Sequence, residues 1–146
     1  MNKRAVRISQ KAALALSGMT IIAAADCRPV SIRDISKILG CSEHHLVKVL
    51  QKLARKGFLV SARGPNGGFA LAKPADTITM KDIFFCVEEE EAETLRSRGR
   101  SAEAVALDEL VFENDCYKLE EQFTAMMEKK KLSDFKDFVI DKFGTL

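Results

Sequence analysis

The polar side chains best suited to chemistry in this chain gather between residues 42 and 56. They recur at helical spacing and combine basic, amide, hydroxyl and imidazole groups, namely Ser42, Glu43, His44, His45, Lys48, Gln51, Lys52 and Arg55. In a helix that enters the major groove of DNA, side chains near its N-terminus reach base edges and later ones meet phosphates. We therefore assign residues 43–45 and Lys48 to base edges, and Ser42 to a phosphate through its hydroxyl group and the helix N-terminus. The other three are candidates for further phosphate contacts, or else form an exposed, solvated helix face.

A second set of candidate contacts lies in the glycine-rich segment 63–68. Arg63 and Asn66 would lie at the tip of a hairpin, where they suit a narrow, A·T-rich minor groove with its concentrated negative potential. Gly67 would let the backbone approach DNA closely, although glycine there could equally serve the turn geometry alone. These three residues are added to the predicted DNA contacts.

The four cysteines form no Cys-x-x-Cys pair, so neither a zinc ribbon nor a thioredoxin-like motif is predicted. Cys27 is expected to pack at the end of the first helix. Cys41 is either a small buried residue or a thiol activated by the following helix N-terminus. Cys86 and Cys116 are the candidate sensor residues, because two subunits would supply four thiolates, enough for a small iron–sulfur cluster. The simplest expectation is that the protein holds no cofactor, with such a cluster as the alternative.

Three helices are predicted around the polar stretch. The first covers Ile8 to Ala23, where apolar residues recur at helical spacing. The second begins at Ser31, the start of a Ser-x-x-Asp sequence, and ends at Gly40, with Ile35 and Ile38 on its apolar stripe. The third is capped by Ser42 and its inward face carries Leu46, Val49, Leu50 and Leu53. Two short amphipathic helices with so short a join predict a helix-turn-helix.

A β-hairpin and a fourth helix complete this domain. Apolar runs at 58–62 and 69–72 flank Asn66-Gly67, a dipeptide that accepts the positive φ angles of a tight turn. Thr79 begins a helix whose apolar face carries Met80, Ile83, Phe84 and Val87. This order of elements predicts a winged helix-turn-helix, mainly α-helical with a small β-hairpin wing.

The rest of the chain is more highly charged. Residues 88–114 are expected to form a loop with some helix, a connecting or sensor segment. Asn114 or Asp115 can cap a long helix, and Ser133 can cap a last one. The apolar side chains of the long helix are Leu119, Phe123, Met126 and Met127. This helix could fold back onto its own domain or pair with a second copy.

We favour pairing, because the winged domain already has a core. The predicted organisation is then a DNA-binding domain at 1–87, a connecting segment at 88–114, and a dimerisation helix with a C-terminal helix at 115–146.

Charge is distributed unevenly over the 146 residues. Residues 1–81 carry 14 Lys and Arg against 4 Asp and Glu, a net charge of +10, whereas residues 82–146 carry 9 against 17, a net charge of −8. A basic half suits a polyanion such as double-stranded DNA, although two solvated faces of opposite sign are the alternative.

The N-terminus has some features of a secretory signal, because basic residues precede the apolar run 12–25. Ser17, Gly18 and Thr20 interrupt this run, and the first helix needs it for the core. The run is also too short to span a bilayer. We therefore expect a cytoplasmic protein without a membrane partner.

Several motifs between residues 30 and 85 are distinctive as a set. They are Ile32–Leu39, Ser42-x-x-x-Leu46, Leu53-x-x-x-Gly57-Phe58-Leu59, Arg63-Gly64-Pro65-Asn66-Gly67-Gly68-Phe69-x-Leu71-Ala72-x-Pro74, Ile78-Thr79 and Asp82-Ile83. In these motifs the chain resembles the Rrf2 (BadM-type) family of winged-helix regulators, strongly here and weakly over 88–113.

The resemblance implies a homodimer on a pseudo-palindromic operator, with crossing C-terminal helices. Many members hold an iron–sulfur cluster through three closely spaced cysteines, of which only Cys116 is matched here.

These features together predict a sequence-specific DNA-binding regulator of transcription, a repressor that acts as a homodimer. Its signal would be a redox change, a metal cluster, a small molecule or a protein effector. The alternative is a winged-helix adaptor that binds proteins and no operator, but an adaptor has no need of the basic side chains between Lys48 and Arg63. No enzyme is predicted, because the chain has neither a nucleophile motif nor a phosphate-binding loop.

Overall fold

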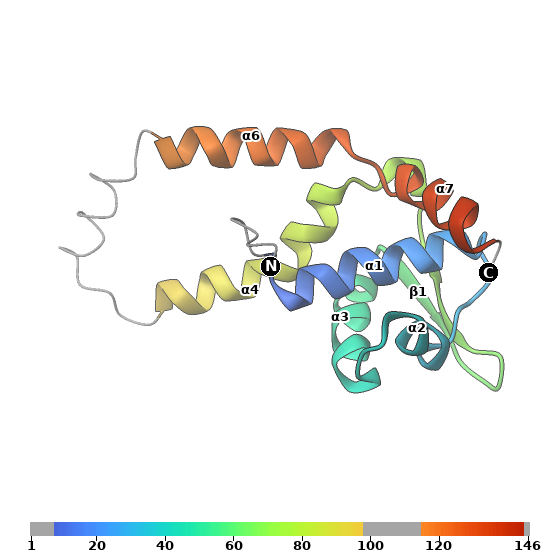
Figure 1. Cartoon of the computed structure of the whole chain (residues 1–146). Helices are drawn as coiled ribbons and strands as arrows, with labels where there is room; N and C mark the ends of the chain where they lie inside the picture. The colour runs from blue at the N-terminus through green and yellow to red at the C-terminus, as the bar shows by residue number, and fades with distance from the viewer. Residues whose placement is uncertain (1–7, 98–114, 145–146) are drawn as a thin grey trace.

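The fold is mainly helical with one two-stranded antiparallel hairpin, as the sequence predicts. The computed structural model describes residues 8–97 and 115–144 (Figure 1). Its elements in chain order are α1 (Gln10–Ala24), α2 (Ile32–Leu39), α3 (Glu43–Arg55), β1 (Leu59–Ala62), β2 (Gly68–Leu71), the 3-10 helix η1 (Ala75–Thr77), α4 (Met80–Ser97), α6 (Asp115–Lys129) and α7 (Leu132–Phe143).

Helices α2 and α3 form the predicted helix-turn-helix. The Ser31 hydroxyl accepts a hydrogen bond from the backbone N–H of Asp34 at 3.1 Å and so caps α2. Gly40 ends this helix in the left-handed conformation, at φ +63°. The four apolar side chains expected on the inward face of α3 are all buried. Ile38 was expected in the apolar stripe of α2, but it is 52% exposed and lies outside the hydrophobic core. Ser42 precedes α3 as expected but forms no side-chain cap bond.

The wing is a hairpin in which Leu59 pairs with Leu71 and Ala62 with Gly68. Its turn differs from the predicted one: the positive φ angle falls at Gly64, at +110°, and a hydrogen bond of 2.9 Å joins the Gly67 N–H to the Gly64 carbonyl. The loop is therefore longer than a two-residue turn. A pair of 2.9 Å backbone hydrogen bonds between Val30 and Phe69 attaches the hairpin to the segment before α2.

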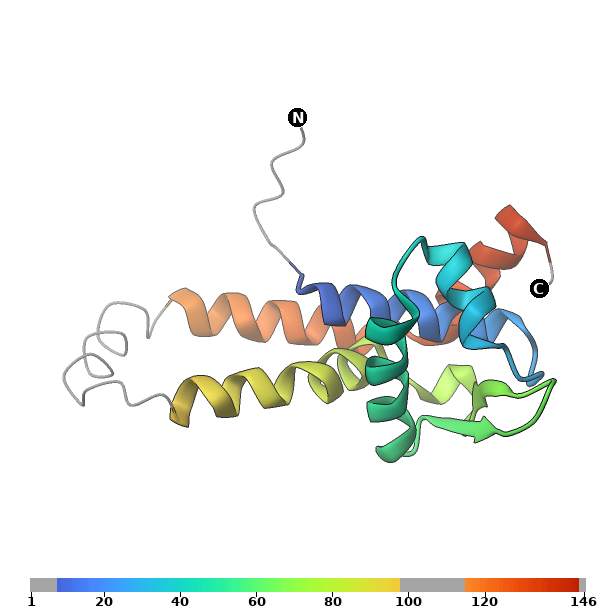
Figure 2. The same ribbon diagram turned by 90° about the horizontal axis from the view of Figure 1, so that it is seen from below.

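Helix α1 lies at the centre of the molecule and contacts α3, α4 and α7 (Figure 2). Small residues let α3 approach it closely: a Cβ atom on Gly18 would lie 3.3 Å from the Leu50 side chain. Met19 and Ile22 of α1 are fully buried beside Leu46 and Leu53 of α3. The core thus forms around α1, and the helix-turn-helix packs against one side of this helix.

Helix α4 is longer than the sequence predicts. It begins with a reciprocal capping box, in which the Thr79 N–H donates to the Asp82 carboxylate at 3.0 Å and the Asp82 N–H donates to the Thr79 hydroxyl at 3.1 Å. It then continues without a break through the acidic residues 88–91 to Ser97, where a loop with some helix was expected. The expected boundary at residue 87 thus falls inside a helix, and residues 98–114 of the expected connecting segment lie outside the described residues.

The last helix, α7, folds back onto the winged domain. Leu132 at its start is 1% exposed, and its N–H donates to the carbonyl of Ile78 at 2.9 Å. An ion pair of 3.3 Å joins Lys136 to Asp26, just after α1. The cap is formed by Asp134, whose carboxylate accepts from the Lys131 N–H at 2.9 Å, and not by Ser133 as predicted. The C-terminal helix therefore contributes to the core, and the expectation that the winged domain forms its core without this helix is wrong.

Helix α6 packs against the first turns of α4, where Lys81 and Glu128 form an ion pair of 3.4 Å. The ring of Phe123 meets that of Phe84 edge to face, at 5.8 Å between centroids. No helix in the described part of the chain is long and apolar enough to cross a membrane.

Candidate nucleic-acid interface

Helix α3 presents most of the predicted DNA contacts to solvent. The exposed side chains are Ser42, Glu43, His44, His45, Lys48, Gln51 and Arg55. His44, Lys48, Gln51 and Arg55 are spaced by four, three and four residues, so they follow one line along the helix, opposite the buried leucines. This line offers imidazole, ammonium, amide and guanidinium groups, which together can hydrogen-bond to base edges and neutralise phosphates.

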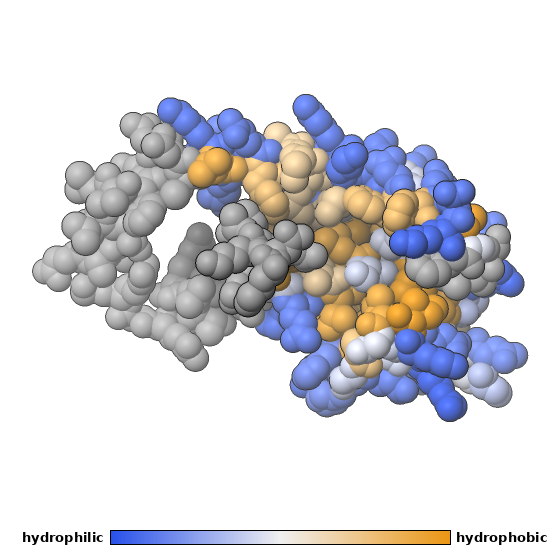
Figure 3. Space-filling view, viewed as in Figure 1, coloured by the Kyte–Doolittle hydropathy of each residue, from blue (hydrophilic) through white to orange (hydrophobic). Residues whose placement is uncertain are grey.

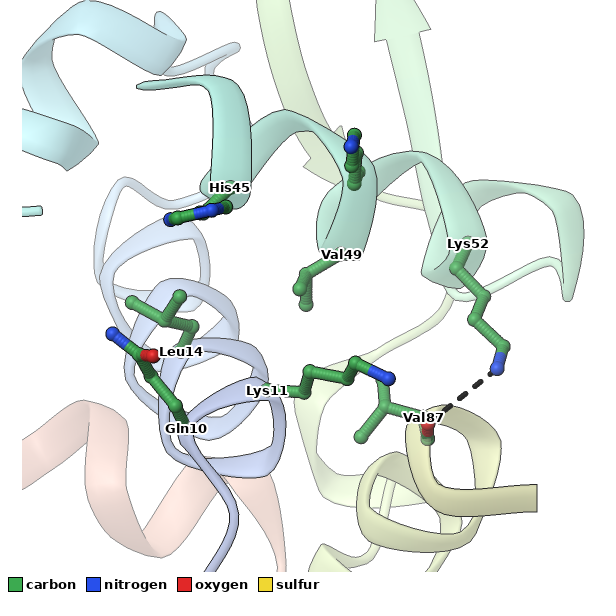
Figure 4. A pocket seen from close by; sticks show the side chains of 8 residues that line it. Gln10, Lys11, Leu14, His45, Val49, Lys52 and Val87 are labelled. Carbon is green, nitrogen blue, oxygen red and sulfur yellow. Dashed lines mark hydrogen bonds between the residues drawn. The ribbon is translucent and has the colours of Figure 1, made fainter. Parts of the chain in front are cut away.

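Two of the predicted contacts lie toward one side of α3. Lys52 is half-buried, and its ammonium group donates a hydrogen bond of 3.4 Å to the backbone carbonyl of Val87 in α4 (Figure 4). His45 borders the same space between α3, α1 and α4. These two side chains therefore face the neighbouring helices as well as solvent, which helical spacing alone did not reveal.

The wing brings its predicted contacts to the same edge of the molecule. Figure 1 shows α2, α3 and the tip of the hairpin along one edge, away from α6, and Figure 2 looks onto this edge from below. Arg63 and Asn66 are exposed there, and this edge is mostly hydrophilic (Figure 3). The helix and the wing are thus placed to meet one extended partner together.

The glycines of the wing serve the hairpin itself. A Cβ atom on Gly67 would lie 2.4 Å from the carbonyl oxygen of Ala62, and one on Gly68 would lie 2.1 Å from that of Val30. The protein's own backbone occupies this space, which favours the turn-geometry interpretation of Gly67. Gly68 serves neither the turn nor an approach to DNA: its missing side chain lets the wing pack on the segment before α2, which the glycines in the sequence did not reveal.

The described cysteines lie on separate elements. Cys86 is buried in the core, Cys41 is half-buried against it, and Cys27 is exposed. The expectation that Cys27 packs at the end of α1 is wrong, because the chain leaves the helix at Ala24 and Cys27 lies at φ +67°. The side chain of Cys116 lies outside the described residues.

Among the side chains that the structure describes, no group of three or more His, Cys, Asp or Glu residues could hold a metal ion.

The four side chains predicted for the dimer interface point in two directions. Leu119 and Met126 are 64% and 56% exposed, whereas Met127 is 2% exposed and Phe123 packs on Phe84. Only the first two are thus accessible on the surface, and the other two pack α6 against the rest of the chain.

The sequence profile of the Rrf2 family, described as an iron-dependent transcriptional regulator, matches residues 8–137. The chain is also similar to the solved structure of CymR, the global cysteine regulator of B. subtilis, with 25% identity and a TM-score of 0.70 over 91% of this chain and 98% of that one. The structure of IscR from T. potens gives 20% identity and a TM-score of 0.72, over 95% of this chain and 92% of that one. The structure of the oxidized form of Staphylococcus aureus CymR gives 22% identity and a TM-score of 0.65, over 87% of this chain and 93% of that one. The last two similarities concern the fold alone.

Proposed function

This chain belongs to the Rrf2 family of transcriptional regulators, and we propose that it represses transcription as a homodimer on a pseudo-palindromic operator. It is a regulator with a winged helix-turn-helix and not an enzyme. In this proposal α3 enters the major groove, and Arg63 and Asn66 of the wing reach the adjacent minor groove.

The observation that carries the proposal is the exposed line of His44, Lys48, Gln51 and Arg55 on the edge that also bears the wing tip. In a helix-turn-helix the second helix reads the major groove. A protein that bound only other proteins would not require the two cations of this line, Lys48 and Arg55, together with the exposed Arg63 of the wing. This arrangement therefore favours the operator-binding regulator over the adaptor.

The homodimer is supported by the exposed apolar side chains of α6. Leu119 and Met126 lie seven residues apart on this helix, so they share one face. Exposed large apolar side chains that cluster on a surface mark interaction sites. Two copies of this face would bring two copies of α3 into the two half-sites of a palindrome.

Operator binding is tested by selecting sequences from a random duplex library with the purified full chain. The selected site should be a pseudo-palindrome, and its affinity should fall steeply as salt rises, with about one counterion released for each phosphate contact. A library without enrichment, together with salt-insensitive capture of a protein, would establish the adaptor instead.

The signal is tested by anaerobic purification, followed by a visible absorption spectrum and measurement of iron and sulfide. A coloured dimer with both elements would assign the signal to a cluster, and Cys86 and Cys116 would be replaced next. A colourless dimer that also fails to bind iron and sulfide on reconstitution would assign it to thiol oxidation, a small molecule or a partner protein.

A further inference from the structure

The tip of the wing carries the dipeptide Asn66-Gly67, and the side chain of Asn66 is exposed there. An asparagine that precedes glycine is chemically labile, because glycine has no side chain to hinder attack of its own backbone nitrogen on the asparagine amide. The other two asparagines of the chain, Asn2 and Asn114, precede lysine and aspartate. Asn66 is therefore the asparagine whose neighbour most favours deamidation.

The hairpin itself requires glycine at residue 67. A Cβ atom there would lie 2.4 Å from the carbonyl oxygen of Ala62 and 2.9 Å from that of Gly64. Both neighbouring atoms belong to the backbone, so they cannot rotate away as a flexible side chain would. The turn thus fixes the residue that makes Asn66 labile.

The same turn protects the nitrogen that would react. The Gly67 N–H donates a hydrogen bond of 2.9 Å to the Gly64 carbonyl. This nitrogen must lose its proton before it can attack the side chain of Asn66, and the hydrogen bond holds that proton in place. The reaction therefore proceeds from a locally opened loop, and its rate depends on how often this hydrogen bond breaks.

We propose that Asn66 is a site of spontaneous deamidation, and that its conversion removes the contribution of the wing to DNA binding. The Gly67 nitrogen forms a bond to the side-chain carbonyl carbon of Asn66. The side-chain nitrogen of Asn66 takes up the proton that Gly67 loses and leaves as ammonia. Water then adds to the resulting succinimide and opens the ring to aspartate or to isoaspartate.

Both products oppose the contact of the wing with the minor groove, so this part of the inference rests on the proposed function. Aspartate has a carboxylate, which the phosphates repel and which lacks the N–H donors of the asparagine amide. Isoaspartate also adds one atom to the backbone beside Gly67 and Gly68. The carbonyl groups of Ala62 and Val30 already fill the space beside these two glycines, so the hairpin has no room to absorb that atom.

The chemistry is tested without DNA. The purified full chain is incubated at mildly alkaline pH, and peptide mass spectrometry measures the conversion of each asparagine. Conversion of Asn66 in buffer should be measurable over days. In urea it should be at least about tenfold faster, a difference of ~1.4 kcal/mol in activation free energy, because unfolding breaks the hydrogen bond to Gly64. Asn66 in urea should also react faster than Asn2 and Asn114.

Three results of this experiment would overturn the proposal. They are no conversion of Asn66 in buffer, a rate in urea no higher than the rate in buffer, and a rate in urea no higher than those of the other two asparagines.

A pair of variants tests the role of the loop. Gly64 lies at φ +110°, so Gly64→Ala strains the loop and should weaken the hydrogen bond from Gly67. In the folded variant the deamidation of Asn66 should become severalfold faster, with folding checked by circular dichroism. Ser61→Ala, an exposed change in β1, is the matched control and should leave the rate unchanged. Equal rates in the two variants would show that this hydrogen bond does not limit the reaction.

The consequence for DNA is measured with variants of Asn66. Asn66→Asp reproduces one product and should weaken operator binding by about tenfold, or ~1.4 kcal/mol. Asn66→Ser removes the amide without adding a charge, so it should weaken binding less. Bound operator should in turn slow the deamidation of Asn66, because coupling between the two is reciprocal.

These measurements separate the inference from the function on which it rests. If the chain selects no operator, the proposed function fails, while mass spectrometry of the free chain still decides whether Asn66 is a modification site. If the chain binds its operator and Asn66→Asp binds as tightly as the unchanged protein, the effect on DNA binding is wrong although the proposed function stands.

Discussion

Gly68 in the wing lies so close to Val30 that a Cβ atom on Gly68 would be 2.1 Å from the Val30 carbonyl oxygen. The same two segments exchange a pair of backbone hydrogen bonds, from Val30 to Phe69 and back. The strand of the wing is thereby fixed to the chain that enters α2. Any side chain at residue 68 would have to separate the wing from the helix-turn-helix.

Replacement of this glycine should therefore destabilise the domain. Gly68→Ala is expected to lower the free energy of unfolding by about 1–3 kcal/mol, because the contact is with backbone that cannot rotate away. The measurement is urea denaturation followed by circular dichroism. Ser61→Ala, an exposed change in the opposite strand, is the control and should have an effect within about 0.5 kcal/mol. Equal stability of both variants would mean that the wing is not held against Val30 in solution.

The wing should contribute to affinity for DNA. Arg63→Ala is expected to weaken operator binding by about fivefold or more, because it removes a cation from the narrow minor groove, while the dimer stays folded. Lys129→Ala, which removes one exposed charge from α6, is the control for net charge and should leave affinity nearly unchanged. Fluorescence anisotropy at fixed salt measures both. If the two variants bind equally well, the wing has no part in recognition.

Residues near the start of α3 should determine which DNA sequence is preferred. Residues near its end should raise the affinity for every DNA sequence alike. His44→Ala is expected to relax the preference at one position of each half-site, where a wrong base pair ordinarily costs about 1–3 kcal/mol. Arg55→Ala should weaken binding to all sequences alike and reduce the salt slope by about one. Competition among operators with single base changes distinguishes the two effects. The reverse pattern would mean that α3 lies in the groove in the opposite sense.

Helix α7 should behave as part of the core. Leu132→Ala is expected to cost about 2–5 kcal/mol of stability, because the side chain is 1% exposed and its removal leaves a cavity. Phe138→Ala removes a larger but exposed side chain from the same helix, and its cost should be small. Thermal unfolding of both variants measures the difference. A Leu132 variant as stable as the Phe138 variant would show that α7 does not pack on α1.

The exposed face of α6 should hold the dimer. The double change Leu119→Glu and Met126→Glu is expected to yield a folded monomer, because it places four carboxylates in one apolar interface. Lys118→Glu, an exposed change on the same helix, controls for added negative charge and should remain dimeric. Light scattering coupled to gel filtration gives the mass of each. A double variant that remains dimeric would place the interface on another surface.

Helices α2 and α3 could be predicted well because their signals are local. The cap at Ser31, the stop at Gly40 and the inward leucines of α3 each act within a few residues. Their spacing in the sequence therefore predicts where these helices begin and end and which face is buried. Ile38 and the turn of the wing were mispredicted where local patterns compete. An apolar residue can fit a helical stripe and still lie outside the core, and Asn-Gly suits a tight turn without requiring one.

The sequence by itself determined the winged helix-turn-helix, the exposed polar face of α3 and the family, because the first two follow from periodicity and caps and the family follows from short motifs. Only the tertiary structure decided that α4 continues to Ser97, that α7 closes the core, and that His45 and Lys52 border a hollow shared with α1 and α4. The physical reason is sequence separation. The link from Lys52 to Val87 joins residues 35 apart, and that from Lys136 to Asp26 joins residues 110 apart. Such contacts depend on how whole helices pack, which no local pattern specifies.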